Sequence, residues 1–172
     1  MKYFMLAEET KNPLPQIGYW FGTLSPKSNT EKFGGAPTWV ILNAAIKDIT
    51  LYSDVLTYPC ILLTEKVLQV FQMYHGKFPS KPVILLDKKN QIDFLYHLAK
   101  LPIYSVLREE SKFDRLKSEV IHGVLDKEKI SGMPIFLIGE VTKPTLIIRE
   151  DVAESLIRRS VKGIKLKGID IM

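Results

Sequence analysis

The pattern of apolar and polar positions is clearest between residues 59 and 75, where it predicts a strand followed by a helix. Residues 59–63 are continuously apolar, which is typical of a buried strand. Over residues 65–75 apolar side chains recur three and four positions apart, as they do on one face of a helix. Thr64 stands at the expected N-cap position, and Gly76 stands where helices often end in glycine.

A second strand-to-helix unit is predicted at about 144–160. Residues 144–148 are apolar, and residues 151–160 are amphipathic, with Glu154 and Arg158 one helical turn apart on the polar face. Moving residues 57–73 by 85 positions onto residues 142–158 aligns four identical pairs, which are Thr57 with Thr142, Pro59 with Pro144, Glu65 with Glu150 and Val67 with Val152. Two explanations stay open, an ancient duplication and convergence on the same local unit.

The other segments are shorter and more interrupted. Strands are predicted at residues 38–42, 81–86, 91–99 and 103–108, and residues 1–50 form a turn-rich N-terminal part rich in proline and glycine. Residues 109–129 are compatible with either a helix or a strand. The whole pattern predicts one α+β domain over residues 1–172, in which residues 51–172 form a body with a mixed or mainly antiparallel sheet and two short helices.

Composition places the chain among ordinary globular proteins. Apolar residues make up 46% and charged residues 25% of the 172 positions, which excludes disordered, collagen-like and coiled-coil classes. The single cysteine, Cys60, excludes an intramolecular disulfide, and its apolar neighbours predict a buried side chain. The N-terminus shows no export signal, and the longest uncharged run, residues 33–46, is too short to cross a bilayer. We therefore expect a cytoplasmic protein without a membrane partner.

The net charge of +5 comes from one segment near the C-terminus. Residues 155–169 contain no acidic residue and five basic ones, which are Arg158, Arg159, Lys162, Lys165 and Lys167. Ile164 and Leu166 alternate with Lys165 and Lys167, which predicts a strand with two buried apolar side chains and two solvent-facing lysines. This segment could be a solvated edge strand, a protein-binding patch or a nucleic-acid site. Because no aromatic residue lies between the cations, the pattern argues against nucleic acid.

No familiar arrangement of catalytic residues or metal ligands occurs in the sequence. The chain lacks dinucleotide, phosphate-loop, serine-elbow and zinc-protease motifs, and its three histidines do not have the spacing of metal ligands. Carboxylate pairs could be assembled from Asp48 with Asp54 or from Glu109 with Glu110, but such pairs occur in any chain with 19 acidic residues. We therefore expect no enzyme activity, no metal and no cofactor.

Four short motifs carry a resemblance to a known family: MKYF at 1–4, TEKV at 64–67, REDV at 149–152 and KGI at 162–164. With the apolar strands before residues 64 and 149, they resemble a widespread bacterial family of immunity proteins from polymorphic toxin systems, mostly from residue 38 onward. In that family a serine commonly stands at the positions of Thr64 and Arg149. The resemblance implies a small cytoplasmic protein that binds and neutralises a cognate toxin without chemistry of its own.

The leading hypothesis is therefore a non-enzymatic immunity protein that occludes a toxin surface. Interface anchors are often aromatic residues or arginines, so we expect contacts from Tyr19, Trp20, Arg158 and Arg159, together with Lys162, Lys165 and Lys167. Because the chain is not acidic, it is a poor mimic of nucleic acid. The alternatives are a nucleic-acid-associated protein that uses the basic C-terminal segment, and an uncharacterised enzyme.

Overall fold

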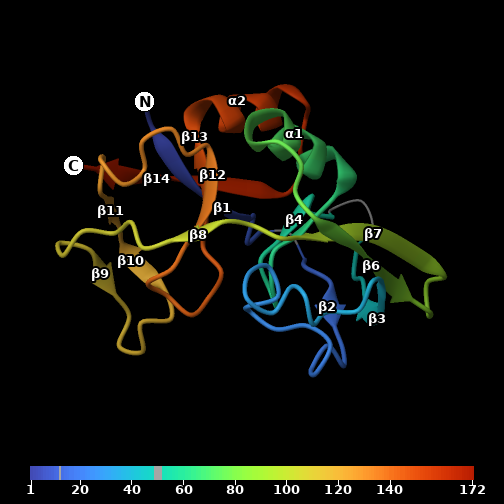
Figure 1. The fold of residues 1–172 in the computed structure, drawn as a ribbon. Helices are drawn as coiled ribbons and strands as arrows, with labels where there is room; N and C mark the ends of the chain where they lie inside the picture. The colour runs from blue at the N-terminus through green and yellow to red at the C-terminus, as the bar shows by residue number, and fades with distance from the viewer. Residues whose placement is uncertain (12, 49–51) are drawn as a thin grey trace.

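Two six-stranded sheets and two helices dominate the computed structural model, which describes residues 1–11, 13–48 and 52–172 (Figure 1). The fold is α+β with mixed sheets, as the sequence predicts. The terminal sheet, named for the strands near both chain ends, has the order β11–β14–β1–β13–β12–β8. Its strands are β1 (Tyr3–Glu8), β8 (Ile103–Tyr104), β11 (Val124–Leu125), β12 (Ile135–Ile138), β13 (Leu146–Arg149) and β14 (Ile164–Ile171).

The central sheet comes mostly from the first hundred residues, and its order is β2–β3–β6–β7–β5–β4. Its strands are β2 (Gln16–Ile17), β3 (Val40–Ala45), β4 (Val55–Leu56), β5 (Leu62–Leu63), β6 (Ser80–Asp87) and β7 (Ile92–Ala99). A separate pair is formed by β9 (Lys112–Phe113) and β10 (Val120–His122). The turn-rich N-terminal part thus contributes β1 to the terminal sheet and β2 and β3 to the central sheet.

Both predicted strand-to-helix units are present. α1 (Glu65–His75) follows β5, and α2 (Glu150–Arg158) follows β13. Thr64 occupies the N-cap position of α1 but makes no side-chain cap hydrogen bond, and Gly76 ends the helix with a φ of 90°, which favours glycine. The alternation around Ile164 is also confirmed, because Ile164 and Leu166 are half-buried while Lys165 and Lys167 are exposed on β14.

The two sheets share one topology over five strands. In the central sheet, α1 connects β5 to β6, and these two parallel strands lie on either side of the antiparallel β7. In the terminal sheet, α2 connects β13 to β14 in the same way, with β1 as the antiparallel strand between them. β3 and β11 then pair in parallel with β6 and β14, and β4 and β12 pair antiparallel with β5 and β13. The one difference in chain order is that β7 follows β6, whereas its counterpart β1 lies at the N-terminus. This shared topology favours duplication over convergence.

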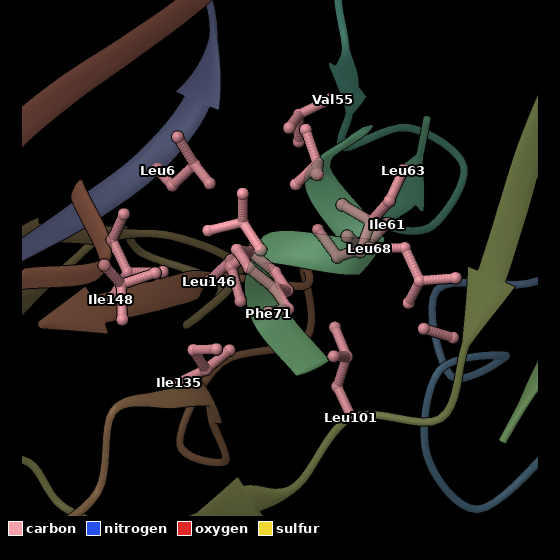
Figure 2. Packing of buried hydrophobic residues seen from close by; sticks show 14 of the residues in the cluster. Leu6, Val55, Ile61, Leu63, Leu68, Phe71, Leu101, Ile135, Leu146 and Ile148 are labelled. Carbon is pink, nitrogen blue, oxygen red and sulfur yellow. The ribbon is translucent and has the colours of Figure 1, made fainter. Parts of the chain in front are cut away.

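The two helices pack against each other, and Figure 1 shows them side by side at the top of the view. Phe71 of α1 lies at the centre of a core that receives Leu146 and Ile148 from the terminal sheet and Leu63 from the central sheet (Figure 2). We call this cluster the shared core; all of these side chains are buried. Each sheet also has a second hydrophobic cluster on the face that points away from the helices.

Two predicted strands are much shorter in the structure, and residues 109–129 form strands and no helix. Only Leu62–Leu63 of the apolar run 59–63 pairs as a strand, and only Ile103–Tyr104 of the run 103–108 does so. Over residues 109–129 the strand alternative is correct, because β9, β10 and β11 form with turns between them and no helix is present there. Phe113, Val120 and Leu125 of this region pack into the hydrophobic cluster on the outer face of the terminal sheet, whereas Leu116 and Ile121 are exposed.

Candidate partner-binding site

A groove of about 660 Å³ runs over β1 on the face of the terminal sheet that points away from α2. We call it the β1 groove. Its floor is formed by Met5 and Ala7 of β1, and Lys165 and Lys167 of β14 border it, because these four residues alternate onto the same face in register. Its other walls come from residues 57–59, 119–120 and 143–146. The groove is therefore an apolar channel with basic residues along one side.

Within the part of the chain that the structure describes, some charged side chains around the β1 groove have a partner of opposite charge or a hydrogen-bond donor, and others do not. Lys143 forms an ion pair with Glu119, and the Thr57 hydroxyl donates a hydrogen bond to the Glu8 carboxylate. Lys167 donates only to the Ile121 carbonyl, at 3.5 Å, and the described residues supply no hydrogen-bond or ion-pair partner for Lys165. Two ammonium groups on one strand thus lack a carboxylate among the described residues, which makes this side of the groove attractive to anionic groups.

Aromatic side chains join the groove to one of the predicted anchors. Tyr58 lines the groove, and its ring meets the edge of Trp20 at a centroid distance of 5.5 Å. Trp20 also stacks on Phe21 at 4.2 Å, while the neighbouring Tyr19 is 87% exposed. Tyr58 therefore brings Trp20 next to the groove that Lys165 and Lys167 border, although these residues are far apart in the sequence.

The structure divides the basic C-terminal segment between two faces. Arg158 lies on α2, where it pairs with Glu154, and Arg159 at the helix end donates to the Ser155 hydroxyl at 2.6 Å. Both are on the helix side of the terminal sheet, whereas Lys165 and Lys167 are on the groove side. The backbone N–H of Lys162 is bound to the Asp54 carboxylate. The five cations do not form one stripe, which counts against a continuous track of phosphate contacts.

The thiol of Cys60 and the imidazoles of the three histidines are held in contacts that serve the fold. Cys60 is fully buried, and desolvation raises the pKa of its thiol to about 12, so its reactive thiolate form is suppressed at neutral pH. His75 stacks on Phe78, and the Nε2 atoms of His97 and His122 lie 2.9 and 3.5 Å from the carboxylates of Glu65 and Asp170, respectively. Within residues 1–11, 13–48 and 52–172, no three metal-ligating side chains gather in one place.

A second exposed surface was not predicted from the sequence. Ile41 of β3, Ile84 of β6 and Leu95 of β7 are cross-strand neighbours on the helix side of the central sheet. Ile41 and Leu95 are 50% and 48% exposed, and Trp39 beside them is 60% exposed. The continuous apolar run 39–42 could have indicated this surface, because such runs are typical of strands that are covered on both faces. We call these residues the β3–β6–β7 face.

Comparison with models of known protein families and with curated proteins found no match for this chain. In the part of the chain that the structure describes, neither helix has the length and apolar character needed to span a membrane.

Proposed function

We propose that the protein is a cytoplasmic bacterial immunity protein, which binds a cognate toxin and neutralises it by covering part of its surface. The observation that carries this proposal is the position of two aromatic residues at the β1 groove: Tyr58 lines the groove that Lys165 and Lys167 border, and Trp20 contacts Tyr58. Tryptophan and tyrosine are enriched among residues that dominate protein interfaces, and a concave apolar surface allows such anchors to be desolvated on binding. The sequence resemblance to immunity proteins supports a toxin as the partner.

Neutralisation by occlusion needs binding energy but no reaction. A stable complex would bury about 1,200 to 2,000 Å² in total, so the toxin would extend beyond the groove onto the exposed rim at Tyr19 and Phe21. Lys165 and Lys167 would accelerate association with an acidic surface and penalise a basic one. This division of roles assigns affinity to the aromatic residues and partner choice to the lysines.

Co-expression tests the proposal directly. The domain encoded by the neighbouring gene is expressed alone and together with this protein. If it is the cognate toxin, we expect growth arrest in the first case and growth with a co-purifying complex in the second. The proposal fails if growth stays arrested and no complex forms.

The binding surface is tested with a pair of aromatic variants. Tyr58→Ala should weaken the purified complex by roughly thirtyfold or more, because an interface anchor contributes about 2 kcal/mol or more. Trp39→Ala, an exposed aromatic residue on the β3–β6–β7 face, serves as the matched control and should change the affinity by less than about threefold. The reverse result would place the toxin on the β3–β6–β7 face instead of the β1 groove.

A further inference from the structure

One edge of β14 is open for part of its length. β14 pairs with β1 along its other edge, from Tyr3 opposite Ile169 to Glu8 opposite Ile164. The Glu9 N–H donates to the Gly163 carbonyl on the β1 side, and the Met172 N–H donates to the Leu125 carbonyl on the opposite side. Because backbone groups alternate along a strand, odd-numbered residues of β14 bond toward β1 and even-numbered residues point outward.

The open part is bounded at both ends. Before it, the backbone of Lys162 bonds to Asp54, and after it β11 pairs with Asp170 and Ile171. Between these ends the outward N–H and C=O groups belong to Ile164, Leu166 and Gly168, and the described residues include no backbone partner for them. The opening is therefore a gap in the sheet edge about five residues long.

The equivalent part of β6 is closed by the chain itself. Leu63 and Ile148 each stand two residues before the helix that follows, so they are equivalent positions. Leu63 pairs with His97, which faces Pro82, and Ile148 pairs with Phe4, which faces Gly168. By register, Lys81 and Pro82 therefore correspond to Lys167 and Gly168. The Lys81 ammonium donates to the carbonyls of Phe33 and Ala36 and lies 4.7 Å from the centre of the Phe33 ring. Pro82 has no N–H to offer, which is a common way to close a strand edge. At the equivalent positions of β14, Gly168 keeps its N–H, and Lys167 makes, in the described part of the chain, only the 3.5 Å contact with the Ile121 carbonyl.

We propose that the open edge of β14 binds an extended segment of the partner in which acidic and apolar side chains alternate, as an added strand. Such a strand would bond to the outward groups of Leu166 and Gly168, with its carboxylates beside Lys165 and Lys167. Its apolar side chains would lie on the opposite face, beside Ile164 and Leu166. A second copy of β14 fits poorly, because antiparallel pairing centred on Leu166 places Lys165 opposite Lys167. This inference rests on the proposed function and specifies the part of the toxin that is recognised.

The test uses the full chain and a short fluorescein-labelled peptide in which glutamate and valine alternate. Fluorescence anisotropy should show binding that weakens with added salt and is roughly tenfold tighter than that of the lysine–valine counterpart. A peptide of the same composition with its glutamates in one block should bind more weakly, because it cannot place apolar and acidic groups on opposite faces. Equal binding of all three peptides would overturn the proposal.

Two variants at Gly168 separate strand addition from simple charge attraction. Gly168→Pro removes an outward N–H without touching the β1 pairing and should weaken binding of the glutamate–valine peptide by roughly tenfold. Gly168→Ala keeps the N–H, fills open space and should bind within about twofold of the original chain. If both variants bind like the original chain, no strand is added at this edge.

A charge reversal remains informative if Gly168→Pro does not fold. The double variant Lys165→Glu and Lys167→Glu should prefer the lysine–valine peptide, and an unchanged preference would contradict the proposal. Binding to a random DNA duplex that depends on both lysines but not on Gly168→Pro would identify a nucleic-acid site instead. If the protein binds the peptide but does not restore growth in the presence of the toxin, only the immunity function is refuted. If it restores growth, and neither Gly168→Pro nor the double charge reversal reduces this effect, only strand addition at the open edge is refuted.

Discussion

Asp54 shows how a single side chain connects the two halves of the molecule. It is buried, and its two carboxylate oxygens accept hydrogen bonds from the Thr64 hydroxyl at 2.8 Å and the Lys162 N–H at 2.6 Å. Its own backbone also bonds to both residues. Asp54 therefore ties the start of α1 to the segment that leads into β14. The sequence suggested catalysis as one use of this carboxylate, and the structure gives it a structural role.

We expect Asp54→Ala to lower the free energy of unfolding by about 2 kcal/mol, because it leaves two partly buried donors without their acceptor. Asp54→Asn is the matched variant: its amide oxygen can accept from the Lys162 N–H while its amide N–H donates to the Thr64 hydroxyl. Urea denaturation should therefore show a smaller loss for Asp54→Asn, of about 1 kcal/mol. Equal losses would mean that the negative charge, and not the hydrogen bonding, is what the site requires.

At the scale of elements, the start of α2 is stabilised by an ion pair in place of a hydroxyl cap. The Arg149 guanidinium donates two hydrogen bonds of 2.8 Å to the Asp151 carboxylate. These hydrogen bonds hold the pKa of Asp151 below its ordinary value of 3.8. Arg149 occupies the N-cap position without a side-chain cap hydrogen bond, and it stabilises the first turn through Asp151 instead.

A lowered pKa in the folded state means that ionised Asp151 stabilises the protein at a pH above the ordinary value. This contribution is lost as the pH falls from about 5 through 3.8 and below. Asp151→Asn should therefore show a smaller loss of stability over this range than the original chain, as measured by urea denaturation at several pH values. Arg149→Met should have the same effect, because Asp151 then loses its partner. If neither variant changes the slope, the ion pair does not contribute to stability.

At the scale of the whole molecule, the shared core makes the two sheets depend on each other. Phe71 is fully buried between side chains of both sheets, and no other side chain of α1 is as large and as completely enclosed. Replacing it leaves a cavity beside the terminal sheet and the central sheet alike. This arrangement is the physical basis for expecting residues 1–172 to behave as one domain.

We expect Phe71→Ala to destabilise the protein by about 3 to 5 kcal/mol, and both sheets to unfold in one transition. Fluorescence of Trp20 and Trp39 reports on the central-sheet half, and amide NMR signals of β13 and β14 report on the terminal sheet. The two denaturation curves should coincide in the original chain and in the variant. Separate midpoints would show two independent domains.

The sequence predicted those features whose cause is local. Residues 65–75 and 151–160 bury one face of a helix, so their spacing records that face directly. The alternation of Ile164 and Leu166 with two lysines likewise records a strand with one covered side. Over residues 109–129 the same reasoning failed to choose between helix and strand. Phe113, Val120 and Leu125 there pack on the terminal sheet while Leu116 and Ile121 are exposed, so burial follows no regular period.

The β1 groove and the open edge could not be predicted, because each depends on residues that meet only in space. Nothing near Tyr58 in the sequence indicates that it lies beside both Trp20 and the groove. The closeness of the five cations in the sequence likewise conceals their division between two faces. The α+β class, the two strand-to-helix units and the lysine-bearing strand follow from local periodicity, so they can be predicted from the sequence. The open part of the β14 edge depends on which distant segments pair with that strand, so it becomes visible only in the folded chain.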